Sequence, residues 1–190
     1  MNNETIDTIL DYIFYYYENY GSEDYIGENV SQIEHMIQAA MLAEQDSQKP
    51  EIVIALFLHD IGHLLDHDNK KKSRMGNYGV VSHESIGKKF LEDIGIPYPI
   101  PDLVCNHVIS KRYLVSTDIN YYNKLSDASK ETFKQQGKYL SKKEISEFEK
   151  NPLHEDSLCV RYYDDRAKVP GLNINSLDYY RSYIKNYLLK

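Results

Sequence analysis

The segment from Pro50 to Leu65 constrains the fold of this chain more than any other part of its sequence. After Pro50 and Glu51, which are typical of the first turn of a helix, it reads IVIALFLHDIGHLL and is apolar on nearly every side. A helix of this kind offers no polar face to water, so we expect it to be the central buried helix of a helical protein. It nevertheless contains His59 and Asp60, and a buried carboxylate is costly unless it is paired or bound to a metal.

Helical periodicity dominates the rest of the chain. It predicts helices over residues 5–19, 31–44, 82–93, from 102 onward, 118–136 in shorter pieces, 141–149, 152–167 and 176–189. Residues 66–80 are charged and contain glycine, which predicts a mobile surface loop. Because the sequence contains no alternating strand pattern, no repeat and no domain linker, we expect an all-α fold in which residues 1–190 form a single helical bundle.

The composition argues against several classes of function. With 29 acidic and 22 basic residues the formal net charge is −7, which disfavours binding to the phosphate backbone of nucleic acids. No apolar run is long enough to span a membrane, and the first residues, MNNETIDTIL, do not resemble a secretory signal. We therefore expect a cytoplasmic protein whose two cysteines, Cys105 and Cys159, are reduced thiols.

Polar residues with metal-binding side chains lie within these apolar helices. His35 is surrounded by apolar residues in the helix predicted over 31–44, which must pack back against the central helix. His63 follows His59 by four residues and Asp60 by three, so a continuous helix places all three near one face. For any one of them alone, a structural ion pair or a capped histidine is the better explanation. As a set, imidazoles and carboxylates indicate a site for iron, manganese or zinc.

Two more histidines are candidates for the same site. His83 opens a predicted helix, where a surface residue is as common as a ligand, and His107 lies in the motif NHVISKRYL. A second pair of imidazoles allows a two-metal site in which a carboxylate is shared. His67 lies in the charged loop and His154 lies just after Pro152, so we assign neither of them a role.

The segment RYYDDRAK, residues 161–168, adds charged residues near the end of a predicted helix. Arg161, Asp164 and Lys168 fall on one face of that helix. Either Asp164 or Asp165 can supply a further carboxylate ligand. Such a pattern is also typical of a solvated face with ion pairs within the helix, so both interpretations remain open here.

The order of these motifs resembles a known family. The sequence contains YIGENVSQIEHMIQAAMLAE, ALFLHDIGHLL, SHESIG, NHVISKRYL, LSDASKET and RYYDDRAK, in that order. Over residues 20–170 this combination resembles the PhnZ-type mixed-valent diiron oxygenases of the HD-domain superfamily, which cleave carbon–phosphorus bonds and are relatives of myo-inositol oxygenase. The resemblance implies that residues 1–190 form a single HD domain, an all-α helical bundle with its metal-site core over residues 20–170.

The resemblance also implies which residues bind the metals, a pair of iron ions in the Fe(II) and Fe(III) states. One ion would be bound by His35, His59 and Asp164, the other by His83 and His107, and Asp60 would bridge them. Two carboxylates against two iron ions leave a strongly positive site, which would attract a phosphonate dianion.

By the same resemblance, four residues would receive the phosphonate: His63, Lys111, Ser129 and Arg161. Lysine and arginine supply charge-assisted donors to such an anion. Lys111 follows His107 by four residues and Arg161 precedes Asp164 by three, so each cation lies on the helical face of a proposed ligand. The alternative is a pair of exposed basic residues.

Tyr25 and Glu28 match a gating pair of the family. The resemblance implies that Tyr25, which with His63 is a catalytic candidate, occupies the oxygen position on the first iron at rest. Glu28 would bind the ammonium group of the substrate and help to draw the tyrosine away. The alternative is a loop tyrosine beside a glutamate that stabilises a helix N-terminus.

The implied reaction oxidises 2-amino-1-hydroxyethylphosphonate, or a close N-substituted analogue such as the trimethylammonium compound, with O2 to glycine and phosphate. We expect a monomer or weak homodimer whose partners are this small phosphonate and O2. The alternative is a metal-dependent HD phosphohydrolase acting on a small phosphate ester or nucleotide, in which Asp127 competes with Asp164 as a ligand. A third interpretation is a binding or regulatory module with a vestigial site, which the presence of all six ligand residues disfavours.

Overall fold

The structure of the chain, a computed structural model, describes residues 1–25, 27–68 and 81–190. Apart from one isolated β-bridge, these ranges contain helices joined by turns and no strand. The predicted all-α fold is therefore confirmed. Most of the surface loop predicted over residues 66–80 lies outside the described residues.

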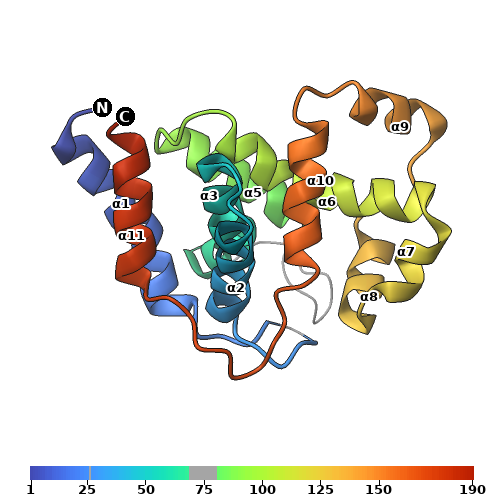
Figure 1. Cartoon of the computed structure of the whole chain (residues 1–190), viewed down its shortest axis with the longest axis horizontal. Coiled ribbons are helices and arrows are strands. Elements are labelled where there is room, and N and C mark those ends of the chain that lie inside the picture. The colour runs from blue at the N-terminus through green and yellow to red at the C-terminus, as the bar shows by residue number, and fades with distance from the viewer. Residues whose placement is uncertain (26, 69–80) are drawn as a thin grey trace.

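The described helices follow one another in the predicted order (Figure 1). They are α1 (Asn3–Tyr20), α2 (Gln32–Gln45), α3 (Pro50–Leu58), α4 (Ile61–Leu64), the short 3-10 helix η1 (Leu65–Asp68), α5 (His83–Asp93), α6 (Ile100–Thr117), α7 (Ile119–Lys124), α8 (Asp127–Gln135), α9 (Lys142–Glu149), α10 (His154–Asp164) and α11 (Leu177–Leu188). The segment predicted over 118–136 divides into α7 and α8 because Ser126 caps a new helix, its hydroxyl accepting from the backbone N–H of Ser129.

The centre of the fold is α3, in which every residue from Ile52 to Leu58 is buried. Helices α2, α6, α10 and α11 pack against it. Figure 1 shows α1 beside α11 at one end of the molecule, with the two chain termini close together. Phe57 stacks between the rings of Tyr17 and Tyr180, at centroid distances of 4.6 and 4.7 Å, and so joins α1, α3 and α11. The prediction of a central buried helix is confirmed.

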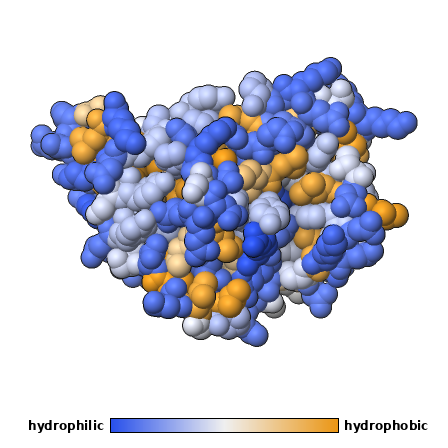
Figure 2. Space-filling view, viewed as in Figure 1, coloured by the Kyte–Doolittle hydropathy of each residue, from blue (hydrophilic) through white to orange (hydrophobic). Residues whose placement is uncertain are grey.

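The outward faces of the helices are mainly polar. Figure 2 shows that the face seen in Figure 1 is largely hydrophilic, with hydrophobic residues in separate groups. None of the described helices is both long enough and apolar enough to cross a membrane. Cys105 and Cys159 are free thiols, as expected.

The prediction of one continuous helix over residues 50–65 is wrong at the position that matters most. Helix α3 ends at Leu58, α4 begins at Ile61, and Asp60 between them has φ −103° and ψ 11°. Successive side chains of an α-helix point about 100° apart, so two neighbours in a helix cannot face one point. With the helix interrupted, the imidazole of His59 and the carboxylate of Asp60 lie together, with Nε2 3.3 Å from Oδ2.

Gly62 brings α4 against the start of α5. A Cβ atom at this position would lie 2.0 Å from the carbonyl oxygen of His83, so the contact requires glycine. Gly87 of α5 lies at the same interface, where a Cβ atom would lie 3.3 Å from the Ile61 side chain. This close approach of two backbones places His83 beside Asp60.

We predict that Gly62→Ala lowers the free energy of unfolding by about 1–3 kcal/mol, because its methyl group overlaps a backbone carbonyl that cannot turn away. Gly87→Ala is the matched control. Its methyl group meets mainly side chains and alanine favours helices, so its effect should stay within about 1 kcal/mol. Urea denaturation followed by circular dichroism measures both. Equal losses of stability would show that the Gly62 contact is not special.

Candidate metal centre and substrate pocket

A capping box fixes the position of His35. The Ser31 hydroxyl accepts a hydrogen bond from the backbone N–H of Glu34, and the Glu34 carboxylate accepts one from the backbone N–H of Ser31. This arrangement starts α2 one turn before His35, which is fully buried. The Nδ1 atom of His35 donates to the carbonyl of Ala167 at 2.8 Å. The backbone after Asp164 turns to make this contact. Helix α10 therefore ends at Asp164 and not at residue 167, where the sequence predicted its end.

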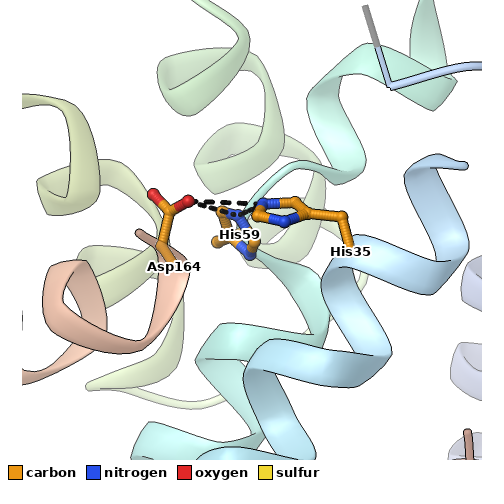
Figure 3. A group of neighbouring side chains, drawn as sticks. All are labelled: His35, His59 and Asp164. Atoms are coloured by element: carbon orange, nitrogen blue, oxygen red, sulfur yellow. Dashed lines mark hydrogen bonds and ion pairs between the residues drawn. The ribbon is translucent and has the colours of Figure 1, made fainter. Parts of the chain in front are cut away.

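His35, His59 and Asp164 converge from the start of α2 and the ends of α3 and α10 (Figure 3). The two Nε2 atoms are 3.0 Å apart, and Asp164 Oδ1 lies 3.3 Å from that of His35 and 3.8 Å from that of His59. The Nδ1 atom of His59 donates to the Leu56 carbonyl at 2.7 Å, as that of His35 does to Ala167. In the neutral rings both Nε2 lone pairs therefore face the same space. Two lone pairs this close repel unless a cation lies between them, so the residues fit a metal ion.

The charges of this cluster also favour a cation. Burial lowers the pKa of His59, but Asp60 and Asp164 outweigh burial and raise that pKa to about 9. Burial raises the pKa of the Asp60 carboxyl, but His59 outweighs it, and the pKa lies well below its usual value. The same balance, with Arg161 as the main partner, holds the pKa of Asp164 low. Both carboxylates are therefore ionised at neutral pH and attract a positive charge, a proton or a metal ion, to the space between the rings.

Asp60, His83 and His107 form a second buried cluster. The Nε2 atoms of the two histidines are 3.0 Å apart, and Asp60 Oδ1 lies 3.3 Å from that of His83 and 3.6 Å from that of His107. The Nδ1 atom of His107 donates to the Val104 carbonyl at 2.6 Å, which leaves its Nε2 as an acceptor. The Nδ1 atom of His83 has no hydrogen-bond partner among the described residues, and the Glu84 carboxylate lies 3.6 Å from it. This second group also fits a metal ion.

The carboxylate of Asp60 joins the two clusters. Its Oδ1 faces the second pair of histidines, whereas its Oδ2 lies 3.3 Å from Nε2 of His59 and 3.7 Å from Nε2 of His35. One oxygen is thus turned toward each pair, which is the arrangement that a bridging carboxylate requires. The arrangement can hold two metal ions that share one ligand.

A pocket of about 530 Å³ opens onto both clusters. His35 and His59 are fully buried beneath it. Its walls contain the other predicted site residues, which are Tyr25, Glu28, Asp60, His63, His83, His107, Lys111, Ser129, Arg161 and Asp164. The structure therefore brings every predicted site residue to one place, although they come from segments far apart in the sequence.

Two buried cations line this pocket. Lys111 is 4% exposed and Arg161 is 3% exposed, so the alternative of two exposed basic residues is wrong. Lys111 donates to Thr132 Oγ1 at 2.9 Å, and burial, followed by the charge of Arg161, lowers the pKa of Lys111 to about 7. Arg161 donates to Asp164 at 2.7 Å and pairs with Asp165. An arginine and a lysine in one buried wall, the lysine able to take up a proton when a negative charge arrives, fit an anion such as a phosphonate or a phosphate.

Asp164, Asp165 and Asp127, the three candidates for the last carboxylate ligand, lie in different places. Asp164 belongs to the first cluster, whereas Asp165 pairs with Arg161 and accepts a hydrogen bond from the Tyr121 hydroxyl. Asp127 is exposed in the first turn of α8. The geometry therefore selects Asp164 and not Asp165 or Asp127 as the carboxylate beside His35 and His59. Tyr121, which also accepts a hydrogen bond from Arg161 Nε at 3.0 Å, had no signal in the sequence.

His63 lies on α4 at the wall of the pocket. Its ring stacks on that of His83 at a centroid distance of 4.0 Å, and its Nε2 lies 3.9 Å from Asp60 Oδ1. Burial, followed by the charge of His83, lowers the pKa of His63 to about 3. The ring is therefore neutral, with one nitrogen as a donor and the other as an acceptor.

The two histidines without an assigned role differ in position. His67 lines the pocket, stacks on Tyr20 at a centroid distance of 4.0 Å and lies 3.1 Å from the Glu23 carboxylate. Its place at the pocket was missed because charged loop residues carry no periodic signal. His154 packs between the rings of Tyr113 and Phe148, away from the pocket residues.

Tyr25 and Glu28 lie on the turn that precedes α2. The backbone N–H of Glu28 donates to the Tyr25 carbonyl at 2.9 Å, and Gly27 supplies the positive φ of 86° in this turn. The Tyr25 ring stacks on that of His35 at a centroid distance of 4.1 Å. Burial raises the pKa of Tyr25, so its phenol stays protonated. The Glu28 carboxylate accepts a hydrogen bond from Lys168, which lies beyond the end of α10 and not on its helical face.

The sequence is similar to proteins from different organisms. Over 187 residues, 98% of this chain and 85% of the relative, the sequence is 42% identical to an uncharacterised protein of Acanthamoeba polyphaga mimivirus. Over 165 residues, 84% of this chain and 80% of the relative, it is 39% identical to the glycine-betaine-forming 1-hydroxy-2-(trimethylamino)ethylphosphonate dioxygenase of Leisingera caerulea.

A second relative is also named as a phosphonate dioxygenase, and a family model matches most of the chain. The sequence is 35% identical over 168 residues, 87% of this chain and 82% of the relative, to the hydroxymethylphosphonate dioxygenase of Gimesia maris. The HD domain family matches residues 33–162, a range that contains both clusters apart from Asp164, which lies two residues beyond its end. With its paired histidines and shared aspartate in place, the chain belongs to the HD domain family.

Proposed function

We propose that this chain is a diiron oxygenase that uses O2 to cleave the carbon–phosphorus bond of 2-amino-1-hydroxyethylphosphonate or a close N-substituted analogue. The observation that carries the proposal is the position of Asp60, which turns one oxygen toward each of two histidine pairs beneath a pocket that also contains Lys111 and Arg161. Two relatives named as phosphonate dioxygenases support this class of substrate.

The proposed cofactor is a pair of iron ions, Fe(II) and Fe(III). His35, His59 and Asp164 would hold one ion, His83 and His107 the other, and Asp60 would bridge them. Imidazole and carboxylate donors without a thiolate suit iron, and the buried Nε2 atoms that face one another support a metal in each cluster. Bound iron supplies the chemistry with O2, which amino-acid side chains cannot perform.

The side chains around the metals would bind and orient the phosphonate. Lys111 and Arg161 provide the charge-assisted donors, and an incoming anion restores the charge of a lysine whose pKa is lowered to about 7. His63, which is neutral, and Ser129, which also lines the pocket, would add hydrogen bonds. The anion would thereby be held with its C1 carbon directed toward Asp60 and the two clusters.

Tyr25, a catalytic residue in this proposal, would control access to the first cluster. Its ring covers His35, and Glu28 lies on the same turn three residues later. An ammonium group that binds the Glu28 carboxylate pulls on this turn, and Tyr25 then moves with it. Uncovering of the first cluster would therefore depend on the substrate, which limits unproductive reaction with O2.

In the proposed reaction the C1–P bond breaks, C1 becomes the carboxylate carbon of glycine, and phosphorus leaves as phosphate. One molecule of O2 supplies the two oxygen atoms that the products contain beyond those of the substrate. The alternative, an HD phosphohydrolase, releases phosphate from a small phosphate ester or nucleotide with water and consumes no O2.

We predict that the iron-loaded protein releases phosphate and glycine from 2-amino-1-hydroxyethylphosphonate and consumes an equimolar amount of O2. An oxygen electrode, a phosphate assay and amino-acid analysis of the same sample measure the three quantities. The matched control is the same sample without O2, which should release no phosphate. Phosphate release under anaerobic conditions would overturn the proposal in favour of hydrolysis.

We also predict that His107→Ala binds about half the iron of the wild type and loses turnover, because one of the two ions loses an imidazole ligand. Iron per folded chain, measured by elemental analysis, tests the cluster without any assay of activity. His154→Ala is the matched control, since His154 packs against aromatic rings outside the pocket. An unchanged iron content in His107→Ala would mean that the second cluster is not a metal site.

A further inference from the structure

The end of the pocket that the proposed function assigns to the substrate ammonium already contains a cation. Lys168 Nζ lies 2.7 Å from Glu28 Oε1, and the two side chains are only 15% and 13% exposed. Both residues line the pocket, and Lys168 Nζ also lies 5.9 Å from the centre of the Tyr25 ring. The Glu28 carboxylate therefore already has a positively charged partner before any substrate binds.

Hydrogen bonds hold Lys168 in this position. Its ammonium donates to Glu28 Oε1 and to the hydroxyl oxygens of Ser126 and Ser129, each at 3.2 Å, which uses all three of its N–H groups. Glu28 Oε1 also accepts a hydrogen bond from the Ser126 hydroxyl at 2.6 Å. No described residue donates to Glu28 Oε2. One oxygen of the carboxylate is thus engaged by the protein, and the other is left for a ligand.

The ion pair between Glu28 and Lys168 changes which substituents of a ligand this wall of the pocket favours. A buried carboxylate without a partner strongly favours a cationic group, because its charge is otherwise uncompensated. Paired with Lys168, Glu28 adds no net charge to this part of the wall, although it still offers one acceptor oxygen. A primary ammonium can donate to that oxygen, whereas a substrate with a methyl group at this place faces no unpaired charge. The wall therefore tolerates both kinds of substituent.

We propose that Lys168 is a specificity-determining residue that neutralises Glu28 and so broadens the range of phosphonates that the pocket binds, from amino-hydroxyphosphonates to hydroxyphosphonates without a cationic group. The proposal rests on the proposed function, since it concerns the substituent carried by the same phosphonate. Lys168 has no N–H group left for the phosphonate itself, because its three N–H groups are directed to Glu28, Ser126 and Ser129, and of these partners only Glu28 carries a charge for it to neutralise.

The test compares two ligands of nearly equal shape, 2-amino-1-hydroxyethylphosphonate and 1-hydroxypropylphosphonate, in which a methyl group replaces the ammonium. Their Kd values are measured by titration calorimetry on iron-loaded protein under anaerobic conditions, so that no turnover is needed. For the wild type we expect the two Kd values to lie within about tenfold of each other. For Lys168→Met we expect the preference for the ammonium ligand to rise by about tenfold or more, as the loss of one compensating charge predicts.

A double-mutant cycle of Lys168→Met and Glu28→Gln tests whether Lys168 sets the preference between the two ligands through Glu28. Glu28→Gln should reduce the preference for the ammonium ligand, and the double variant should behave like Glu28→Gln, because Lys168 acts through that carboxylate. Lys130→Met is the matched control: this lysine lies 5.9 Å from the centre of the Tyr122 ring and is not a pocket residue, so the ratio should not change.

Two outcomes would overturn the proposal. If Lys168→Met weakens both ligands by the same factor, Lys168 binds the phosphonate and does not set specificity. If the preference changes equally with and without Glu28, the lysine does not act through that residue. Failure of the proposed function would give a different result. The ratio of the two Kd values would then be as expected, but the protein would release no phosphate in the presence of O2.

Discussion

The buried carboxylate of Asp60 is the constraint on which the rest of the site depends. It is 3% exposed, belongs to the second cluster and turns its other oxygen toward the histidines of the first, so it joins the two clusters. A buried carboxylate is costly unless positive charge surrounds it, and the histidines and metal ions of the proposed centre provide that charge. The interruption between α3 and α4 turns Asp60 inward, and the Gly62 contact brings His83 up to it.

Charge compensation also explains the walls of the pocket. Lys111 and Arg161 are cations that burial makes unfavourable, and the two Asp residues beside Arg161 compensate only that side chain fully. An anion in the pocket completes the balance next to Lys111. At the other end Lys168 and Glu28 compensate each other without a ligand. In the proposed function, the Lys111 side of the pocket would receive the charged phosphonate, and the Glu28 side would accept a substituent with or without a charge.

The helical fold and the candidate ligands could be predicted because hydrophobic periodicity is a local property of the sequence. His59 and Asp60 were conspicuous since polar residues rarely occur in so apolar a segment. The two errors in the ends of helices were of one kind. A continuous helix was expected through His59, and α10 was expected to reach residue 167, yet both helices end where a side chain or a carbonyl group turns toward the metal site. Helix ends set by such distant contacts leave no periodic signal.

The sequence by itself determined the all-α class, the central buried helix and the residue types of a metal site, because these follow from composition and spacing along the chain. Only the tertiary structure decided that Asp164 and not Asp165 or Asp127 lies beside the histidines, that Asp60 faces both pairs, and that Lys168 neutralises Glu28. These facts join residues up to 140 positions apart. The direction of a side chain across such a distance is fixed by how whole helices pack, and no local pattern contains it.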